Sequence, residues 1–325
     1  MSSSNRFPSY AELLKNDPPG SAWEVWGDRV GLGALNHLTD DRVARAARLV
    51  RRGARFPLGL SIDAIDPPLF GRAAPTHTLT NGYGALHHDD VLDGFNTQLA
   101  SQWDGFRHVR HHVFGWYGGV LEECHGIDQW AKRGIAGRGV LLDVARWREA
   151  RGRPLDPVEP EGISAADLDA VLSWQGVDIE FGDLVFMRTG WLSWYRSASL
   201  EEKASMAATP RCAGLLPGHA TLAWLWDHRV AAIVSDNPTV ELWPVGSRAS
   251  DEDRARVEAD ARLVGELSIH RSVIPLLGIP LGELFDLDDL AQDCAEHSGW
   301  DFFVTAAPLG IAGGAASPAN AIAFK

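Results

Sequence analysis

The sequence predicts an α/β protein with a mixed central sheet and flanking helices. Four short apolar runs bounded by turn residues have the length of buried strands, at positions 139–144, 183–189, 230–236 and 301–307. Helical patterns lie between these runs in the second half of the chain, whereas the first half is richer in strand-like segments. This arrangement is typical of helices packed against one sheet.

The helices are expected from their caps and their periodicity. Ser164 is followed three residues later by Asp167, which is the spacing of a capping box at the start of a helix. Thr39 is expected to cap an amphipathic helix over 40–53. Further helices are predicted over 10–14, over 218–229 and over the long stretch 251–277.

The composition favours a folded protein whose partner is a small molecule. The 325 residues are 45% hydrophobic and carry a net charge of −13, which argues against nucleic acid as a partner. No apolar run has the length of a membrane span, and the start lacks the features of a signal peptide. Three distant cysteines without a C-x-x-C pair argue against a zinc finger and favour reduced thiols in the cytoplasm. We expect a polar arm over 1–30 and one domain over 31–325.

The stretch QLASQWDGFRH, residues 98–108, concentrates groups that bind metals or move protons. If it is extended, Gln98, Gln102 and Asp104 point to one face and offer oxygen ligands to a hard cation. His108 follows at the same parity and can transfer protons near neutral pH. The alternative is a solvated strand face, with Trp103 and Phe106 in the core.

A second candidate cluster lies near the end of the chain. His270 is expected at the end of a helix, and Glu283 follows the turn made by GIPLG. A glutamate in an apolar segment needs a partner if it is buried. Taken alone, the segment favours a helix-capping or surface glutamate.

Together the two clusters resemble the metal-dependent cyclase family, whose members include kynurenine formamidase-like and isatin hydrolase-like enzymes. The family signature H-x-G-T-H-x-D-x-P-x-H aligns without a gap with residues 98–108. Segments such as FGDLVFMRTGW, AAIVSDNPTVE and APLGIAGGAASPANAIA follow in family order. The resemblance extends roughly from Gly31 to the C-terminus and implies a swivelling β/β/α fold.

The resemblance also implies roles for the candidate residues. Asp104 would bind a divalent metal ion, His108 would donate and accept protons, and His270 and Glu283 would complete the metal site. Gln98 and Gln102 occupy the two metal-binding histidine positions, while Ser101 and Phe106 replace Thr and Pro. Amide oxygens are weaker zinc ligands than imidazoles, which shifts the preference toward manganese, magnesium or calcium. With the family resemblance, manganese or zinc is expected, and magnesium is a further option. One ion or two, or loss of the metal, are left open.

The function implied is hydrolysis of an amide, lactam or lactone bond by metal-activated water, with His108 as acid and base. Two alternatives stay open: a cyclase or lyase that uses the ion as a Lewis acid, and a non-catalytic small-molecule-binding relative. Substrate contacts are expected from Trp26, Trp103, Phe106 and Trp191. The resemblance further implies a homo-oligomer, either a dimer or a tetramer.

Some polar residues outside these clusters have two interpretations. His111 and His112 are adjacent and face opposite ways on a strand, so a supporting role is favoured over replacement of a missing ligand. Asp236 and Asn237 follow a predicted strand, where a functional role and a turn-forming role are about equally supported.

Overall fold

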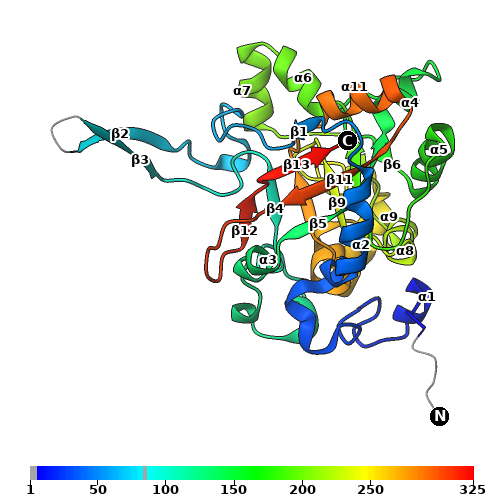
Figure 1. Ribbon diagram of the computed structural model, residues 1–325. Helices are drawn as coiled ribbons and strands as arrows, with labels where there is room; N and C mark the ends of the chain where they lie inside the picture. The colour runs from blue at the N-terminus through cyan, green and yellow to red at the C-terminus, as the bar shows by residue number, and fades with distance from the viewer. Residues whose placement is uncertain (1–5, 83–85) are drawn as a thin grey trace.

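The centre of the molecule is a curled mixed sheet flanked by helices (Figure 1). In the computed structural model, which describes residues 6–82 and 86–325, nine strands form this sheet. In spatial order they are β1 (Arg55–Pro57), β13 (Ala321–Phe324), β11 (Asp301–Ala306), β5 (Ile135–Asp143), β7 (Leu184–Arg188), β9 (Ala232–Ser235), β10 (Leu281–Glu283), β4 (Gln102–Asp104) and β12 (Ala316–Pro318). Neighbours from β5 to β10 are parallel, and the outer pairs are antiparallel.

The helices and the short sheets complete this α/β architecture, which confirms the predicted fold class. The α-helices are α1 (Tyr10–Leu13), α2 (Asp40–Ala46), α3 (Asp128–Arg133), α4 (Val144–Glu149), α5 (Ala165–Gln175), α6 (Trp191–Ser197), α7 (Leu200–Ala208), α8 (His219–Asp227), α9 (Asp251–Ala259), α10 (His270–Ser272) and α11 (Asp288–His297). Two-stranded sheets are formed by β2 (Thr76–Gly82) with β3 (His87–Asp93) and by β6 (Gly162–Ile163) with β8 (Gly214–Leu215).

Most of the predicted elements are present. The four apolar runs form β5, β7, β9 and β11, and the capping box of Ser164 and Asp167 begins α5. The helix predicted over 40–53 is shorter, because α2 gives way to a 3₁₀ turn over Ala47–Leu49. The backbone N–H groups of Arg52 and Ala54 then donate to the carbonyl of Lys325, which draws the chain to the edge of the sheet.

The long helix predicted over 251–277 is wrong, since this stretch is divided into four short helical pieces. α9 is followed by 3₁₀ helix Ala261–Glu266, by α10 and by a π-helical turn over Val273–Leu277. Two carboxylates cause the breaks because each caps a new helix start: Asp260 accepts from the N–H of Arg262, and Glu241 accepts from the N–H of His270.

The two halves of the candidate site meet through strand pairing. β4 and β10 are antiparallel neighbours, with Gln102 opposite Glu283 and Asp104 opposite Leu281. Both strands are buried, and β12 covers the other edge of β4. Residues that are 181 positions apart in the sequence are therefore side by side at the centre of the site.

The N-terminal region and the β2–β3 hairpin lie outside the central sheet. The N-terminal region packs on it, since Tyr10 is buried and its backbone N–H donates to Asp227 of α8. The β2–β3 hairpin instead projects away from the sheet, and nearly all of its side chains are exposed (Figure 1). None of the helices in the described part of the chain combines the length and apolar character that a bilayer crossing needs.

Candidate metal centre and active site

Asp104 is the centre of a buried cluster of possible metal ligands. Its side chain is completely buried, with His108 Nε2 3.8 Å and His270 Nε2 3.7 Å from Oδ2. These separations are too long for hydrogen bonds, yet they suit ligands that share one ion at about 2.0–2.2 Å each. One ligand atom from each of the three residues lies within 4.8 Å of the other two.

Gln102 and Glu283 extend the cluster across the β4–β10 pair. Gln102 Nε2 donates to Glu283 Oε2 over 2.6 Å, and His270 Nε2 lies 3.0 Å from Glu283 Oε1. Two buried oxygens, Gln102 Oε1 and Asp104 Oδ2, have no hydrogen-bond partner among the described residues. A buried acceptor without a partner costs about 1–3 kcal/mol, and a cation would remove that cost. The residues present therefore fit a divalent ion.

Gln98 reaches the cluster by a different route from the one predicted. It lies in a turn before β4 and not in an extended strand, so the predicted parity over 98–104 is wrong. Its Nε2 donates to Asp104 Oδ1 over 2.8 Å and lies 3.3 Å from His108 Nδ1. In this geometry Gln98 orients Asp104 and His108, and its role as a metal ligand stays a prediction.

Glu241 is the site residue that the sequence analysis missed. It is fully buried, and its Oε1 accepts from His270 Nδ1 over 2.7 Å and from the His270 N–H over 3.1 Å. Its Oε2 accepts from the N–H of Ile269 over 2.6 Å. A carboxylate on Nδ1 fixes the ring so that Nε2 is presented to Asp104 and Glu283, as is usual for metal-binding histidines. The argument used for Glu283, a lone acid in an apolar segment, could have identified it.

Burial and neighbouring groups shift the pKa values of Glu283, Asp104, His108 and His270 in different directions. Burial raises the pKa of Glu283 to about 7, and the Asp104 charge adds to the rise. Although burial acts against it, the neighbouring His108 and His270 hold the pKa of Asp104 below its usual value. Burial lowers the pKa of His108, whereas hydrogen bonds to carboxylates outweigh burial and raise the pKa of His270. The lowered pKa favours the neutral form of His108, which is the form that can accept a proton.

A cavity of about 320 Å³ adjoins this cluster. Its wall includes three members of the site, His108, His270 and Glu283. The rest of the lining is aromatic, aliphatic, cationic or hydroxyl-bearing: Phe70, Arg72, Val109, Pro238, Thr239, Trp243, Val245, Ser268 and Arg271, together with Glu241. A concave site of this size with a few polar groups at one end is typical of an active site for a small molecule.

The four aromatic residues predicted to contact substrate do not line this cavity. Trp103 is buried against Phe285, and its Nε1 donates to the carbonyl of Ala319. Trp191 is buried in a smaller core cluster and stacks on Tyr195.

The other two aromatic residues pack elsewhere in the protein. Phe106 is buried against Tyr117 and Trp130, and Trp26 packs on His37 near the N-terminus. Trp103, Phe106 and Trp191 are all buried and lie away from this cavity wall, and their contact with substrate stays a prediction.

His111 and Asp236, for which the sequence allowed two interpretations each, both accept hydrogen bonds from backbone N–H groups. His111 Nδ1 accepts from the N–H groups of Val113 and Phe114 and so stabilises a turn. Asp236 accepts from the N–H of Thr189 and of Gly190, which ties the ends of β7 and β9 together.

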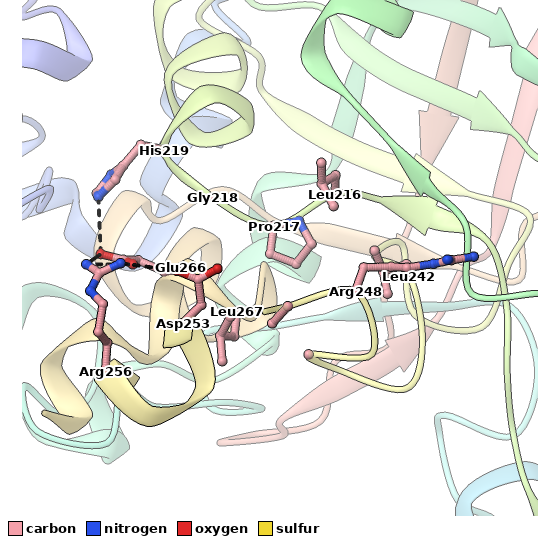
Figure 2. A pocket seen from close by; sticks show the side chains of 12 residues that line it. Leu216, Pro217, Gly218, His219, Leu242, Arg248, Asp253, Arg256, Glu266 and Leu267 are labelled. Carbon is pink, nitrogen blue, oxygen red and sulfur yellow. Dashed lines mark hydrogen bonds and ion pairs between the residues drawn. The ribbon is translucent and has the colours of Figure 1, made fainter. Parts of the chain in front are cut away.

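A second cavity, of about 440 Å³, lies away from the cluster between the start of α8 and α9 (Figure 2). Its charged side chains are largely paired with one another: Arg256 contacts both Asp253 and Glu266, and His219 lies 3.8 Å from Glu266. Because it contains no member of the buried cluster, we assign the candidate active site to the smaller cavity.

Comparisons with known proteins show the family of this chain. The model of the family described as Putative cyclase matches residues 58–242. A solved structure described as a novel cyclase is 30% identical, with 94% of this chain and 99% of that chain covered and a TM-score of 0.78. No curated protein matches the chain.

Isatin hydrolases share the fold at lower identity. Isatin hydrolase A from Labrenzia aggregata, bound to benzyl benzoate, is 17% identical, with a TM-score of 0.58 and 89% and 98% of the two chains covered. The enzyme from Ralstonia solanacearum is 15% identical, with a TM-score of 0.60 and coverage of 88% and 95%. With a family model matched over more than half of its length and a 30% identical relative over nearly all of it, the chain belongs to the Putative cyclase family.

Proposed function

We propose that this protein is a metal-dependent hydrolase that cleaves an amide, lactam or lactone bond in a small molecule. The observation that carries the proposal is the pair of unpartnered buried oxygens, Gln102 Oε1 and Asp104 Oδ2, beside His108 and His270. The cavity that adjoins this cluster has room for a small substrate.

The residues that would hold the ion are Asp104, Gln102, His270 and Glu283. This mixed set of oxygen and nitrogen donors suits manganese or zinc, with magnesium as the next option. When bound, a divalent ion polarises a carbonyl group and makes water acidic enough to act as a nucleophile near neutral pH. Glu241 would keep His270 in the orientation and tautomer needed for binding.

His108 is the residue suited to proton transfer. Its ring lies on the cavity wall, Gln98 contacts its Nδ1, and burial lowers its pKa so that it is neutral near pH 7. A neutral imidazole accepts a proton from the attacking water and returns it to the leaving nitrogen or oxygen. General acid–base catalysis of this kind typically contributes about 10²- to 10⁴-fold in rate.

We place hydrolysis before ring formation because isatin hydrolases share this fold, although the 30% identical structure is described as a cyclase. Two of the similar structures are isatin hydrolases by name, and they cover most of this chain. Ring opening or ring closure without net addition of water is the alternative within the same family.

The test is metal content and turnover of the purified protein beside its Asp104→Asn variant. We expect about one equivalent of manganese or zinc per chain, turnover of at least one formamide, lactam or lactone, and loss of both in the variant. Chelator should abolish turnover and one metal should restore it. Oxygen from ¹⁸O-labelled water should enter the product acid, and its absence would favour the cyclase alternative. A wild-type protein that binds no divalent ion would favour the non-catalytic alternative.

A further inference from the structure

We propose that the active-site cavity selects substrates that carry a carboxylate on a small ring, and that Arg72 and Arg271 bind this carboxylate. The inference deepens the proposed function, on which it rests for the identity of the cavity as the active site. Both arginines line the cavity together with His108 and Glu283.

Arg72 is held in place on the cavity wall without an acidic partner. Its Nη1 donates to the carbonyl of Gln98 over 2.6 Å, and its guanidinium carbon lies 5.4 Å from the centre of the Phe70 ring. No carboxylate of the described residues forms an ion pair with it. Its positive charge acts on Asp104, His108 and Glu283, so it lies near enough to influence the reacting end of a substrate.

Arg271 directly follows His270 in α10 and has still fewer contacts. Its side chain is only partly exposed, and it forms no hydrogen bond or ion pair within residues 6–82 and 86–325. A guanidinium group has five N–H donors, and none of those of Arg271 is used by a protein group among these residues, so all five are available to a ligand in the cavity.

The carboxylates of the site do not need these arginines. Asp104 accepts from Gln98, Glu283 accepts from Gln102, and Glu241 is surrounded by the donors at the start of α10. In the second cavity Arg256 is paired with Glu266 (Figure 2). Arg248 of that cavity donates to the carbonyl of Pro160 and is exposed, whereas Arg72 and Arg271 lie beside the buried cluster. Arginine donors that line a cavity and lack a protein partner are suited to a planar anionic group, which a guanidinium binds in a two-pronged contact.

The rest of the lining indicates the body of the substrate. Phe70 and Trp243 meet edge to face at 5.5 Å, and Val109 and Val245 add aliphatic surface. A cavity of about 320 Å³ with these walls suits one aromatic or cyclic unit. The substrate class is therefore a small ring compound that bears a carboxylate beside its amide, lactam or lactone bond.

Binding of benzoate and of its neutral isostere benzamide to the metal-loaded protein tests the inference. We expect benzoate to bind at least about tenfold more tightly, measured by titration calorimetry, because hydrogen bonds to charged groups are the stronger ones. Arg271→Gln and Arg72→Gln should each weaken benzoate binding about tenfold and leave benzamide binding unchanged. Arg248→Gln, at an exposed arginine of the second cavity, is the matched control and should change neither.

Two results would overturn the inference. Benzamide that binds as tightly as benzoate would show that charge is not recognised, and benzoate binding that survives in both arginine variants would place the carboxylate on the metal. Arg271→Gln keeps the test valid if Arg72→Gln fails to fold, because the Arg271 side chain forms no hydrogen bond or ion pair in the described part of the chain. Arginine-dependent benzoate binding without any turnover would refute the proposed function alone. Wild-type turnover of a neutral ring substrate as fast as that of its carboxylate-bearing analogue would refute the carboxylate selection alone.

Discussion

Replacing Glu241 by glutamine should weaken metal binding without touching a metal ligand. The carboxylate accepts hydrogen bonds from Ser268 Oγ, from the N–H groups of Ile269 and His270, and from His270 Nδ1. Glutamine keeps one acceptor, but its NH₂ group would meet a donor at the other position. We therefore expect His270 to lose its fixed orientation in Glu241→Gln.

The size of the effect follows from these contacts. Replacing a supporting group of this kind typically lowers metal affinity about 10- to 100-fold, which corresponds to about 1.4 to 2.7 kcal/mol. Leaving one buried N–H of Ile269 or His270 without an acceptor should also cost about 1–3 kcal/mol of folding free energy. The metal-induced rise in melting temperature should consequently shrink in the variant.

The assay is competition of the protein with a chelating dye for manganese or zinc, beside thermal unfolding with and without metal. Glu266→Gln is the matched control, since Glu266 is a partly exposed carboxylate nearby that contacts Arg256 and His219. Its metal affinity should equal that of the wild type. A Glu241→Gln variant that is less stable but binds metal within twofold of the wild type would refute the positioning role.

Three other predictions follow from the site, the core and the surface. Metal affinity should fall by more than tenfold from pH 8 to pH 6, because the raised pKa values of Glu283 and His270 mean that both must release protons to bind the ion, and a flat profile would contradict this. Phe106→Ala should lower the free energy of unfolding by about 3–5 kcal/mol in denaturant titrations, with an unchanged Michaelis constant, since Phe106 is core and not cavity wall. Light scattering should report a dimer or tetramer, because an isolated two-stranded hairpin is only marginally stable and Leu79 and Leu92 are 57% and 42% exposed on it. Leu79→Asp with Leu92→Asp should then lower the mass, whereas a monomeric wild type would contradict the prediction.

The sequence predicted the positions of the strands and the candidate metal-binding side chains better than it predicted which strand faces are buried. Apolar runs identified β5, β7, β9 and β11 because buried strands are continuous in hydrophobicity. The prediction that Gln98, Gln102 and Asp104 share one strand face was wrong, because the chain turns before β4. The alternation of polar residues in β4 did not indicate a solvent-exposed face either. β4 lies between β10 and β12 and is buried on both faces, so Trp103 belongs to the core although polar residues flank it.

The geometry of the site could not be predicted because it depends on contacts between distant segments. The pairing of Gln102 with Glu283 is set by the register of β4 and β10, and no local pattern encodes that register. Glu241 is likewise far from His270 in the sequence, and its position depends on how the loop after β9 folds back. The family resemblance supplied Asp104, His108, His270 and Glu283, while the network that orients them required the structure.

That network explains why the backbone is strained next to both acidic residues of the cavity wall. Val240 and Leu284 have φ values of 57° and 53°, a conformation that costs about 1–3 kcal/mol for residues other than glycine. Asn237 stabilises both bends, since its Oδ1 accepts from the Val240 N–H over 2.7 Å and its backbone carbonyl accepts from the Leu284 N–H over 3.0 Å. One residue after β9 thus fixes the chain beside Glu241 and beside Glu283. Asn237 therefore has the turn-forming role that the sequence offered as one of two interpretations. The turn holds the carboxylates of Glu241 and Glu283, both of which contact His270, so a functional role through these two acids stays a prediction.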